Sequence, residues 1–136
     1  MSDDLQRRID DFLSGSPHAV VGASRDRAKY GNKVLRAYLQ QRRAVYPVNP
    51  TAIEVEGLAA FPRLSSLPEP VHGISIITPP AITEQIVEEA HQAGIKHLWM
   101  QPGAQSAKAV ARARSLGMNV IGGDACILVV LGYSGH

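Results

Sequence analysis

The segment Val20–Ser24 combines residue types that could bind a phosphate group. Two valines end an apolar run that predicts a buried strand, and Gly22 after them permits a tight turn and a close approach of a ligand. The helix expected after this turn would direct its unpaired N–H groups toward an anion. Arg25 and Lys29 follow shortly and would add positive charge. The sequence therefore predicts a phosphate-binding turn at the end of the first strand.

The same turn differs from the Gly-x-Gly-x-x-Gly fingerprint of NAD sites, because the next glycine after Gly22 is Gly31. The second expected strand ends in residues 48–50 (Val-Asn-Pro) without the acidic residue that would hold an adenosine ribose. Glu54 and Glu56 come too far along the chain for that role. Nearby basic side chains could meet a phosphorylated ribose or simply be solvated: Arg25, Lys29 and Arg42.

No set of residues typical of an enzyme active site stands out. The five histidines are scattered without the spacing of metal ligands, and Cys126 is the only cysteine, so we expect no metal site and no internal disulfide. His91 and His97 are interpreted as solvated or packed side chains, and the glutamates of residues 84–89 as a solvated helix face. We therefore expect binding without catalysis.

Composition is typical of a soluble α/β protein, with 45% hydrophobic residues and a formal net charge of +2. This charge is too small to indicate nucleic acid or a membrane surface as a partner. No apolar run approaches the roughly 20 residues that a membrane span needs, and the first residues do not resemble a secretion signal. We expect a cytoplasmic protein with one domain over residues 1–136.

Apolar runs and helical periodicity alternate along the chain. Strands are predicted at residues 18–22, 44–48, 73–78, 95–100 and 118–121. Helices are predicted at residues 3–13, 31–41, 83–93 and 104–116, the first belonging to an N-terminal segment of residues 1–14 that packs on one edge of the sheet. A weaker pattern allows a short edge strand at 57–61, and the Pro/Ser-rich stretch 62–70 resembles a linker.

This alternation predicts an α/β fold with a single Rossmann-like, doubly wound parallel sheet and helices on both faces. In such a sheet, ligands bind outside the carboxyl ends of the strands. The turns to consider are therefore those at residues 22–24, 48–50, 78–80 and 101–103, which are polar or rich in glycine and proline. Four such turns at one sheet edge favour a ligand cleft.

Several of these segments together resemble the small CoA-binding proteins, whose fold is that of the N-terminal nucleotide-binding domain of the succinyl-CoA synthetase α subunit. The resemblance extends from about Ser16 to Leu128. It rests on Val21-Gly22-Ala23-Ser24, Tyr46-Pro47-Val48-Asn49-Pro50, Ile77-Thr78-Pro79-Pro80, Trp99-Met100-Gln101-Pro102-Gly103 and Cys126 after the last strand.

The resemblance implies coenzyme A (CoA) as the ligand and assigns a part of it to each turn. The turn of Gly22, Ala23 and Ser24 would carry the CoA pyrophosphate, and Lys29 would help to neutralise phosphate. The adenosine side would be lined by Pro47, Asn49 and Pro50. Across the cleft would stand Thr78, Pro79 and Pro80, with Gln101 and Gly103 toward the pantetheine arm.

Three functions stay open at this stage. The first is the binding of CoA or an acyl-CoA by a non-catalytic carrier, sensor or accessory module. The second is an NADP(H)-binding redox enzyme or sensor, because the missing acidic residue tolerates a 2′-phosphate. The third is a structural role with a protein partner or a second copy of the chain. Cys126 could exchange its thiol with that of CoA, or it could be a small packed residue.

Overall fold

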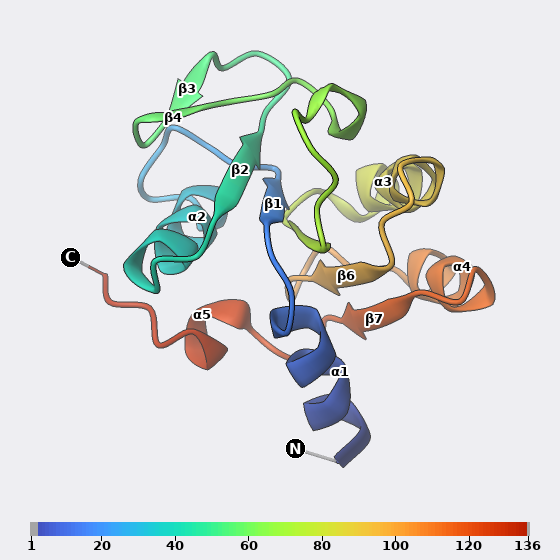
Figure 1. Cartoon of the computed structure of the whole chain (residues 1–136). Coiled ribbons are helices and arrows are strands. Elements are labelled where there is room, and N and C mark those ends of the chain that lie inside the picture. Colours follow the sequence, from blue (N-terminus) through green and yellow to red (C-terminus); the bar gives the residue numbers. More distant parts are fainter. Residues whose placement is uncertain (1–2, 136) are drawn as a thin grey trace.

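The computed structural model describes residues 3–135, which form a parallel sheet between two layers of helices (Figure 1). The strands run in the order β2-β1-β5-β6-β7, and each neighbouring pair is parallel. Their bounds are His18–Val21 for β1, Val45–Val48 for β2, Gly73–Ile76 for β5, His97–Met100 for β6 and Asn119–Gly122 for β7. The predicted Rossmann-like, doubly wound sheet is confirmed. Residues 1, 2 and 136, which the predicted domain and N-terminal segment include, lie outside the described part.

The order of the strands reverses between β1 and β5. The chain leaves β1 for β2 at one edge of the sheet, and later enters β5 on the other side of β1. In sheets of this kind, a crevice forms outside the carboxyl ends of the strands at that point. The turns after β1 and β5 contain Gly22 and Thr78, so the sheet brings two of the predicted site segments together.

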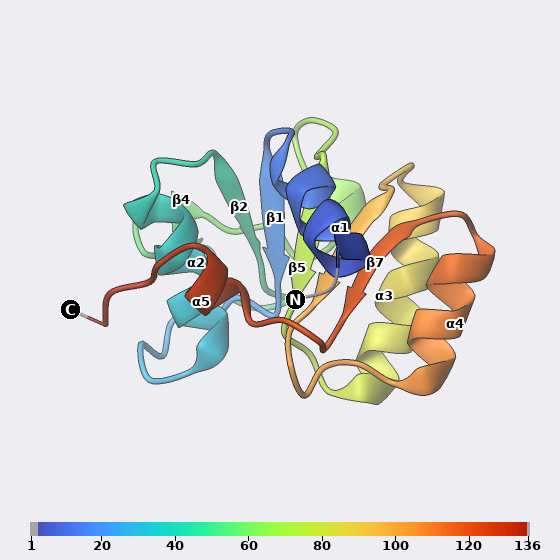
Figure 2. The same cartoon turned by 90° about the horizontal axis from the view of Figure 1, so that it is seen from below.

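Helices cover both faces of the sheet (Figure 2). One face carries α1 (Asp3–Leu13), α2 (Tyr30–Gln40) and α5 (Ile127–Val130), and the other carries α3 (Pro80–Gln92) and α4 (Ala107–Ser115). As predicted, the first helix packs at one edge of the sheet, against β7 and β6. Within residues 3–135, no helix is long and apolar enough to cross a membrane.

Capping chemistry explains where two helices begin. The third helix begins at Pro80 rather than at residue 83, because proline fits the first helical position, where its missing N–H has no partner to lose. The fourth begins at Ala107 rather than at 104, because the Ser106 hydroxyl accepts a hydrogen bond from the Ala109 N–H at 3.0 Å and caps that end. The short α5 was not predicted, since its four apolar residues show no helical period.

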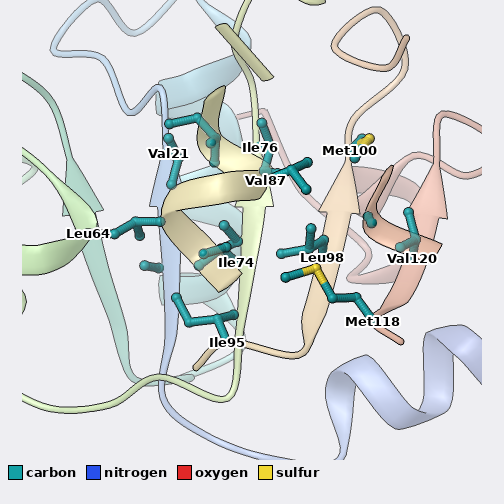
Figure 3. Close-up of a cluster of buried hydrophobic side chains, with 14 of the residues drawn as sticks. Val21, Leu64, Ile74, Ile76, Val87, Ile95, Leu98, Met100, Met118 and Val120 are labelled. Atoms are coloured by element: carbon teal, nitrogen blue, oxygen red, sulfur yellow. The ribbon is translucent and has the colours of Figure 1, made fainter. Parts of the chain in front are cut away.

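Alternate residues of the central strands point to opposite faces, and each face has its own apolar core. Ile74, Ile76, Leu98 and Met100 pack under α3 and α4 (Figure 3). On the opposite face, Trp99 and Ile121 of the strands pack against α1, α2 and α5, together with Phe12 and Tyr38. Strands that are buried on both faces consist of continuous apolar runs, and this pattern made the central strands predictable.

The predicted edge strand at 57–61 is confirmed only at Phe61, which pairs in parallel with β2 at the edge of the sheet. The residues before it form a two-stranded hairpin instead. It pairs β3 (Glu54–Val55) with β4 (Leu58–Ala59) in antiparallel fashion, apart from the main sheet. Glu56 and Gly57 turn the chain with φ angles of 51° and 80°, the positive values that a two-residue hairpin turn of type I′ requires. The hairpin therefore brings the chain back toward the carboxyl edge within six residues, 54–59.

The stretch 62–70, which resembled a linker, contains a 3-10 turn, η1, at Leu64–Ser66. Leu64 is buried in the core under α3 (Figure 3). A buried leucine anchors this connection to the sheet.

Candidate functional site

The turn after β1 is built around a glycine whose conformation and surroundings both exclude a side chain. Gly22 has φ +95°, and a Cβ at this position would collide with the carbonyl oxygen of Ile77. The backbone of Ile77 is itself held by a 2.8 Å hydrogen bond from its N–H to the Val21 carbonyl. The end of β5 thus packs directly against the turn.

A second glycine, which the sequence analysis noted only as misplaced for the NAD fingerprint, lies equally close. A Cβ on Gly31 would collide with the carbonyl oxygen of Gly22. Gly31 is in the first turn of α2, so its lack of a side chain lets the start of the helix lie against the phosphate turn. This is the role of a glycine in close helix–strand packing, at a spacing unlike that of the NAD fingerprint. A glycine in the first turn of a predicted helix was the available signal.

The start of α2 has the properties of an anion site. The Lys29 side chain, at the N-cap position, makes no capping hydrogen bond, and the first turn of the helix contains no acidic residue. Among residues 3–135, no acceptor is found for the backbone N–H groups of Tyr30 and Gly31 or of Ser24. These groups and the positive end of the helix dipole favour an anion here. The N–H groups of the turn itself differ, since Gly22 and Ala23 both donate to Val48.

A buried polar network holds the loop between the turn and α2. The Asn32 side chain is fully buried and donates from Nδ2 to the Ser24 carbonyl at 2.8 Å and to Glu56 at 3.2 Å. Its Oδ1 accepts from Nε of Arg36 at 2.7 Å, and Arg36 also donates to the Arg27 carbonyl at 2.9 Å. This network was not predicted from the sequence. The signal was a pair of polar residues, four apart, on the apolar face of a predicted helix.

Asn49 connects the end of β2 to the same turn. Its Nδ2 donates to the Ala23 carbonyl at 2.8 Å, while its Oδ1 accepts from the N–H groups of Thr51 at 2.9 Å and Ala52 at 2.8 Å. The side chain lies at the predicted edge, with its amide engaged in shaping the two turns. Asn49 therefore positions the backbone that a ligand would meet.

A hollow of about 250 Å³ lies between the turns after β5 and β6. Its lining consists of Tyr30, Ile77, Thr78, Pro79, Gln101, Pro102, Gly103 and Ala104. Tyr30, which the sequence analysis did not single out, is 58% exposed and joins the start of α2 to this hollow. An exposed aromatic at the rim of a hollow is a common feature of ligand sites.

The side chain of Gln101 is directed into the protein. It is 4% exposed, accepts a hydrogen bond from the Ile127 N–H at 3.0 Å, and donates to the sulfur of Cys126 at 3.0 Å. These bonds fix the start of α5, whose N-cap residue is Cys126. Cys126 is half-buried, and its exchange with a thiol ligand stays a prediction.

The structure sorts the predicted site residues into two adjoining groups. Hydrogen bonds join the first group around the turn: Gly22, Ala23, Ser24 and Asn49. The hollow collects the second: Thr78, Pro79, Gln101 and Gly103. Four lie outside both groups: Lys29 at the start of α2, Pro47 within β2, exposed Pro50, and Pro80 in the first turn of α3.

Two larger cavities lie elsewhere. One, of about 650 Å³, is a surface hollow lined by residues of α3 and α4, among them Arg112 and Glu88, which form an ion pair at 2.9 Å. The other, of about 610 Å³, lies below η1 near the amino ends of the strands and includes Val71 and Ile95. Neither is lined by a predicted site residue. The second lies near the amino ends of the strands, whereas ligands of such sheets bind outside the carboxyl ends.

Three histidines that are scattered in the sequence meet at the amino ends of the strands. The rings of His72 and His97 stack with centroids 4.2 Å apart, and His18 lies 5.7 Å from His72. Burial lowers the pKa of His18 to about 4, and it also lowers the pKa of His97. His18 and His72 contact carbonyl oxygens of α1, those of Phe12 and Asp11, both at 2.8 Å. Within residues 3–135, no group of three His, Cys, Asp or Glu residues could hold a metal ion.

Known families and solved structures resemble this chain in sequence and in fold. A family described as a CoA binding domain matches residues 17–132 of the chain. A conserved hypothetical protein from Pyrococcus furiosus is 38% identical, with a TM-score of 0.80 over 85% of this chain and 99% of its own. A hypothetical protein from Pyrococcus horikoshii is 25% identical, with a TM-score of 0.86 over 95% of this chain and 92% of its own.

Longer relatives carry a similar segment as a small part of their length. The α subunit of ADP-forming acetate–CoA ligase II from Pyrococcus furiosus is 33% identical over 65% of this chain, but over only 20% of its own length. A dinucleotide-forming acetyl-coenzyme A synthetase of Ca. Korarchaeum cryptofilum, solved with phosphate and ADP, is 33% identical with a TM-score of 0.74. The match covers 84% of this chain and 27% of that protein.

Proposed function

Since the chain belongs to the CoA-binding domain family, we propose that it binds coenzyme A or an acyl-CoA at the carboxyl edge of the sheet. The observation that carries this proposal is the contact between the Gly22 turn and the uncapped start of α2. Two glycines let backbone approach backbone there, and the N–H groups of Tyr30 and Gly31 are left without acceptors among the described residues. A diphosphate matches such a site in charge and in hydrogen-bonding capacity.

The rest of the ligand would extend to either side of this point. The adenosine would lie toward the end of β2, beside Pro47, Asn49 and Pro50. The pantetheine arm would lie in the hollow between Thr78 and Gly103, which borders the phosphate turn through Ile77 and Tyr30. Lys29 and Arg25, both exposed, would face the phosphates.

We propose a binding, carrier or sensor role rather than ligase activity. The chain spans 11% to 20% of the length of the curated acetate–CoA ligases that it matches. In the hollow, Thr78 shares a 2.7 Å hydrogen bond with Thr83, and the Gln101 amide holds the start of α5. These side chains support positioning of a ligand, and they supply no nucleophile paired with a base.

Isothermal titration calorimetry with CoA, acetyl-CoA, NADH and NADPH tests the proposal. We expect binding of CoA, weakened roughly threefold to tenfold by Lys29→Ala, which removes a charge facing the phosphates. Lys96→Ala is the matched control, because Lys96 is exposed just before β6 at the opposite edge of the sheet. Binding of NADPH without CoA would favour the redox alternative, and no affinity for any nucleotide would favour a structural role.

Gly22 is a poor position for this test. A side chain there would collide with the Ile77 backbone, so a Gly22 variant would report on folding as much as on the ligand. A charge change at exposed Lys29 avoids that ambiguity.

A further inference from the structure

The tip of the β3–β4 hairpin carries a carboxylate to the predicted phosphate loop. In Figure 1 the hairpin lies beside the segment that leads into α2. Glu56 occupies the tip with φ 51°, a left-handed conformation that is uncommon for a side chain of this type. From the sequence alone, Glu56 comes too far along the chain to hold an adenosine ribose, but the hairpin turn returns it to the phosphate loop.

Glu56 pairs there with a basic residue of the loop. Its Oε1 lies 2.5 Å from a guanidinium nitrogen of Arg27, and its Oε2 accepts from Asn32 at 3.2 Å. The same Asn32 nitrogen donates to the Ser24 carbonyl, so the carboxylate is one hydrogen-bonding atom away from the phosphate turn. Its side chain is 18% exposed, whereas that of Arg27 is 57% exposed.

We propose that Glu56 is an internal competitor of the ligand, which occupies Arg27 when no phosphate is bound and thereby limits the affinity for CoA. This inference rests on the proposed function, because it concerns the same phosphate turn. Binding would transfer the Arg27 guanidinium from the carboxylate to a ligand phosphate. Glu56 would then keep its hydrogen bond from Asn32.

The structure allows this exchange at low cost. An ion pair with one largely exposed partner contributes little to stability, so a phosphate can displace the carboxylate from Arg27. The Arg27 backbone carbonyl is meanwhile held by Arg36, so the side chain can move while the loop keeps its shape. Arginine also binds phosphate and carboxylate through the same planar set of donors.

The test is the affinity of the full chain for CoA, measured by calorimetry with Glu56→Gln. Glutamine keeps the length of the side chain and its ability to form hydrogen bonds, but it removes the competing charge. We therefore expect CoA binding to become roughly three- to tenfold tighter. Glu54→Gln is the matched control, since Glu54 is exposed on the same hairpin and its side chain has no hydrogen bond or ion pair among the described residues. It changes the net charge equally and should leave the affinity within about twofold.

A double-mutant cycle identifies Arg27 as the contested group. Arg27→Ala should weaken CoA binding, and in that background Glu56→Gln should lose most of its effect, because no cation is left to release. Equal gains with and without Arg27 would overturn the competition and leave only direct repulsion. Unchanged or weaker binding by Glu56→Gln alone would also overturn the inference, because it would make Glu56 a brace of the loop.

A second variant guards against a folding defect at the turn. Glu56→Asn creates an Asn-Gly pair, which favours the positive φ angles of this hairpin, and its shorter side chain does not reach Arg27. It should tighten CoA binding as Glu56→Gln does, and weaker binding would count against the inference. Absence of CoA binding by the unsubstituted chain would instead remove the proposed function, so the two failures are distinguishable.

Discussion

At the scale of single residues, the candidate site depends on two glycines that touch through backbone atoms. Gly22 lies against Ile77, and Gly31 lies against Gly22, so the ends of β1 and β5 and the start of α2 meet without a side chain between them. At this contact, the backbone N–H groups of Tyr30 and Gly31 have no acceptor among the described residues. Phosphate recognition of this type needs the absence of side chains more than it needs any particular one.

Gly31→Ala should therefore destabilise the protein although alanine favours helix. Alanine in a helix is worth up to about 1 kcal/mol over glycine, but its Cβ would collide with the Gly22 carbonyl. We expect a loss of more than about 2 kcal/mol of unfolding free energy in urea titrations. Gly135→Ala, at an exposed position with no atom within 4 Å of the added Cβ, should change it by less than about 0.5 kcal/mol. A neutral Gly31→Ala would contradict this packing.

At the scale of elements, α1 covers the exposed edge of the sheet at β7. Arg8 donates to the outward-facing carbonyl of Val120 at 2.7 Å, and Asn119 donates to the Arg8 carbonyl at 2.9 Å. Asp124 accepts from the Gly122 N–H at 3.0 Å and lies 3.5 Å from Arg8. An edge strand offers unpaired backbone groups to other chains, and these side chains occupy two of them.

Arg8→Ala should loosen this edge. The substitution removes the donor to a backbone carbonyl and the partner of Asp124, so we expect a loss of about 1 to 2 kcal/mol in unfolding free energy. Arg7→Ala, one position earlier on the exposed side of the helix, is the matched control and should be nearly neutral. Amide hydrogen exchange at β7 should accelerate only in the Arg8 variant, and equal effects of both variants would disprove the edge role.

At the scale of the whole molecule, the two ends of the sheet have different chemistry. The carboxyl edge presents glycines, prolines and basic residues, whereas the amino edge holds His18, His72 and His97 below α1. His18 is fully buried, and its Nδ1 has no hydrogen-bond partner among the described residues. Protonation of that nitrogen would place a charge in the core, near Arg43 and the other two histidines.

The stability of the protein should accordingly fall in acid. Burial lowers the pKa of His18 from 6.5 to about 4, so the unfolded chain takes up this proton more readily than the folded one. The contribution of neutral His18 to the free energy of unfolding is fully present above pH 6.5. As the pH falls toward 4, this contribution is lost, and the free energy of unfolding decreases by up to about 3 kcal/mol. Urea unfolding at roughly pH 7.5 and roughly pH 4.5 measures this loss.

His18→Phe supplies the comparison for this measurement. Phenylalanine fits the aromatic surroundings of Phe12 and Tyr38 and cannot take up a proton. The variant should be less stable at neutral pH, because it loses the bond to the Phe12 carbonyl, but it should lose less stability in acid. His91→Gln, at an exposed position, should retain the full acid sensitivity. The same acid sensitivity in His18→Phe would refute the assignment.

Local signals in the sequence determined the alternating fold and predicted the candidate site. Apolar runs marked the buried strands, and Gly22, Asn49 and Pro80 each marked the place where a predicted strand ends. These features depend on residues a few positions apart, whose backbone preferences act within one turn or strand. For the same reason, the cluster of turns at one sheet edge was predictable from the alternation alone.

Only the tertiary structure decided which distant residues meet. Glu56 returns to Arg27 because a two-residue turn reverses the hairpin, and Gln101 reaches Ile127 because β6 and β7 are neighbours in the sheet. His18 and His72 meet because β1 pairs with β5. Such contacts are set by strand order and packing, which leave no periodic trace in the chain. The sequence alone thus predicted a phosphate-binding turn, and the fold placed beside it the carboxylate that we propose as a competitor of the ligand.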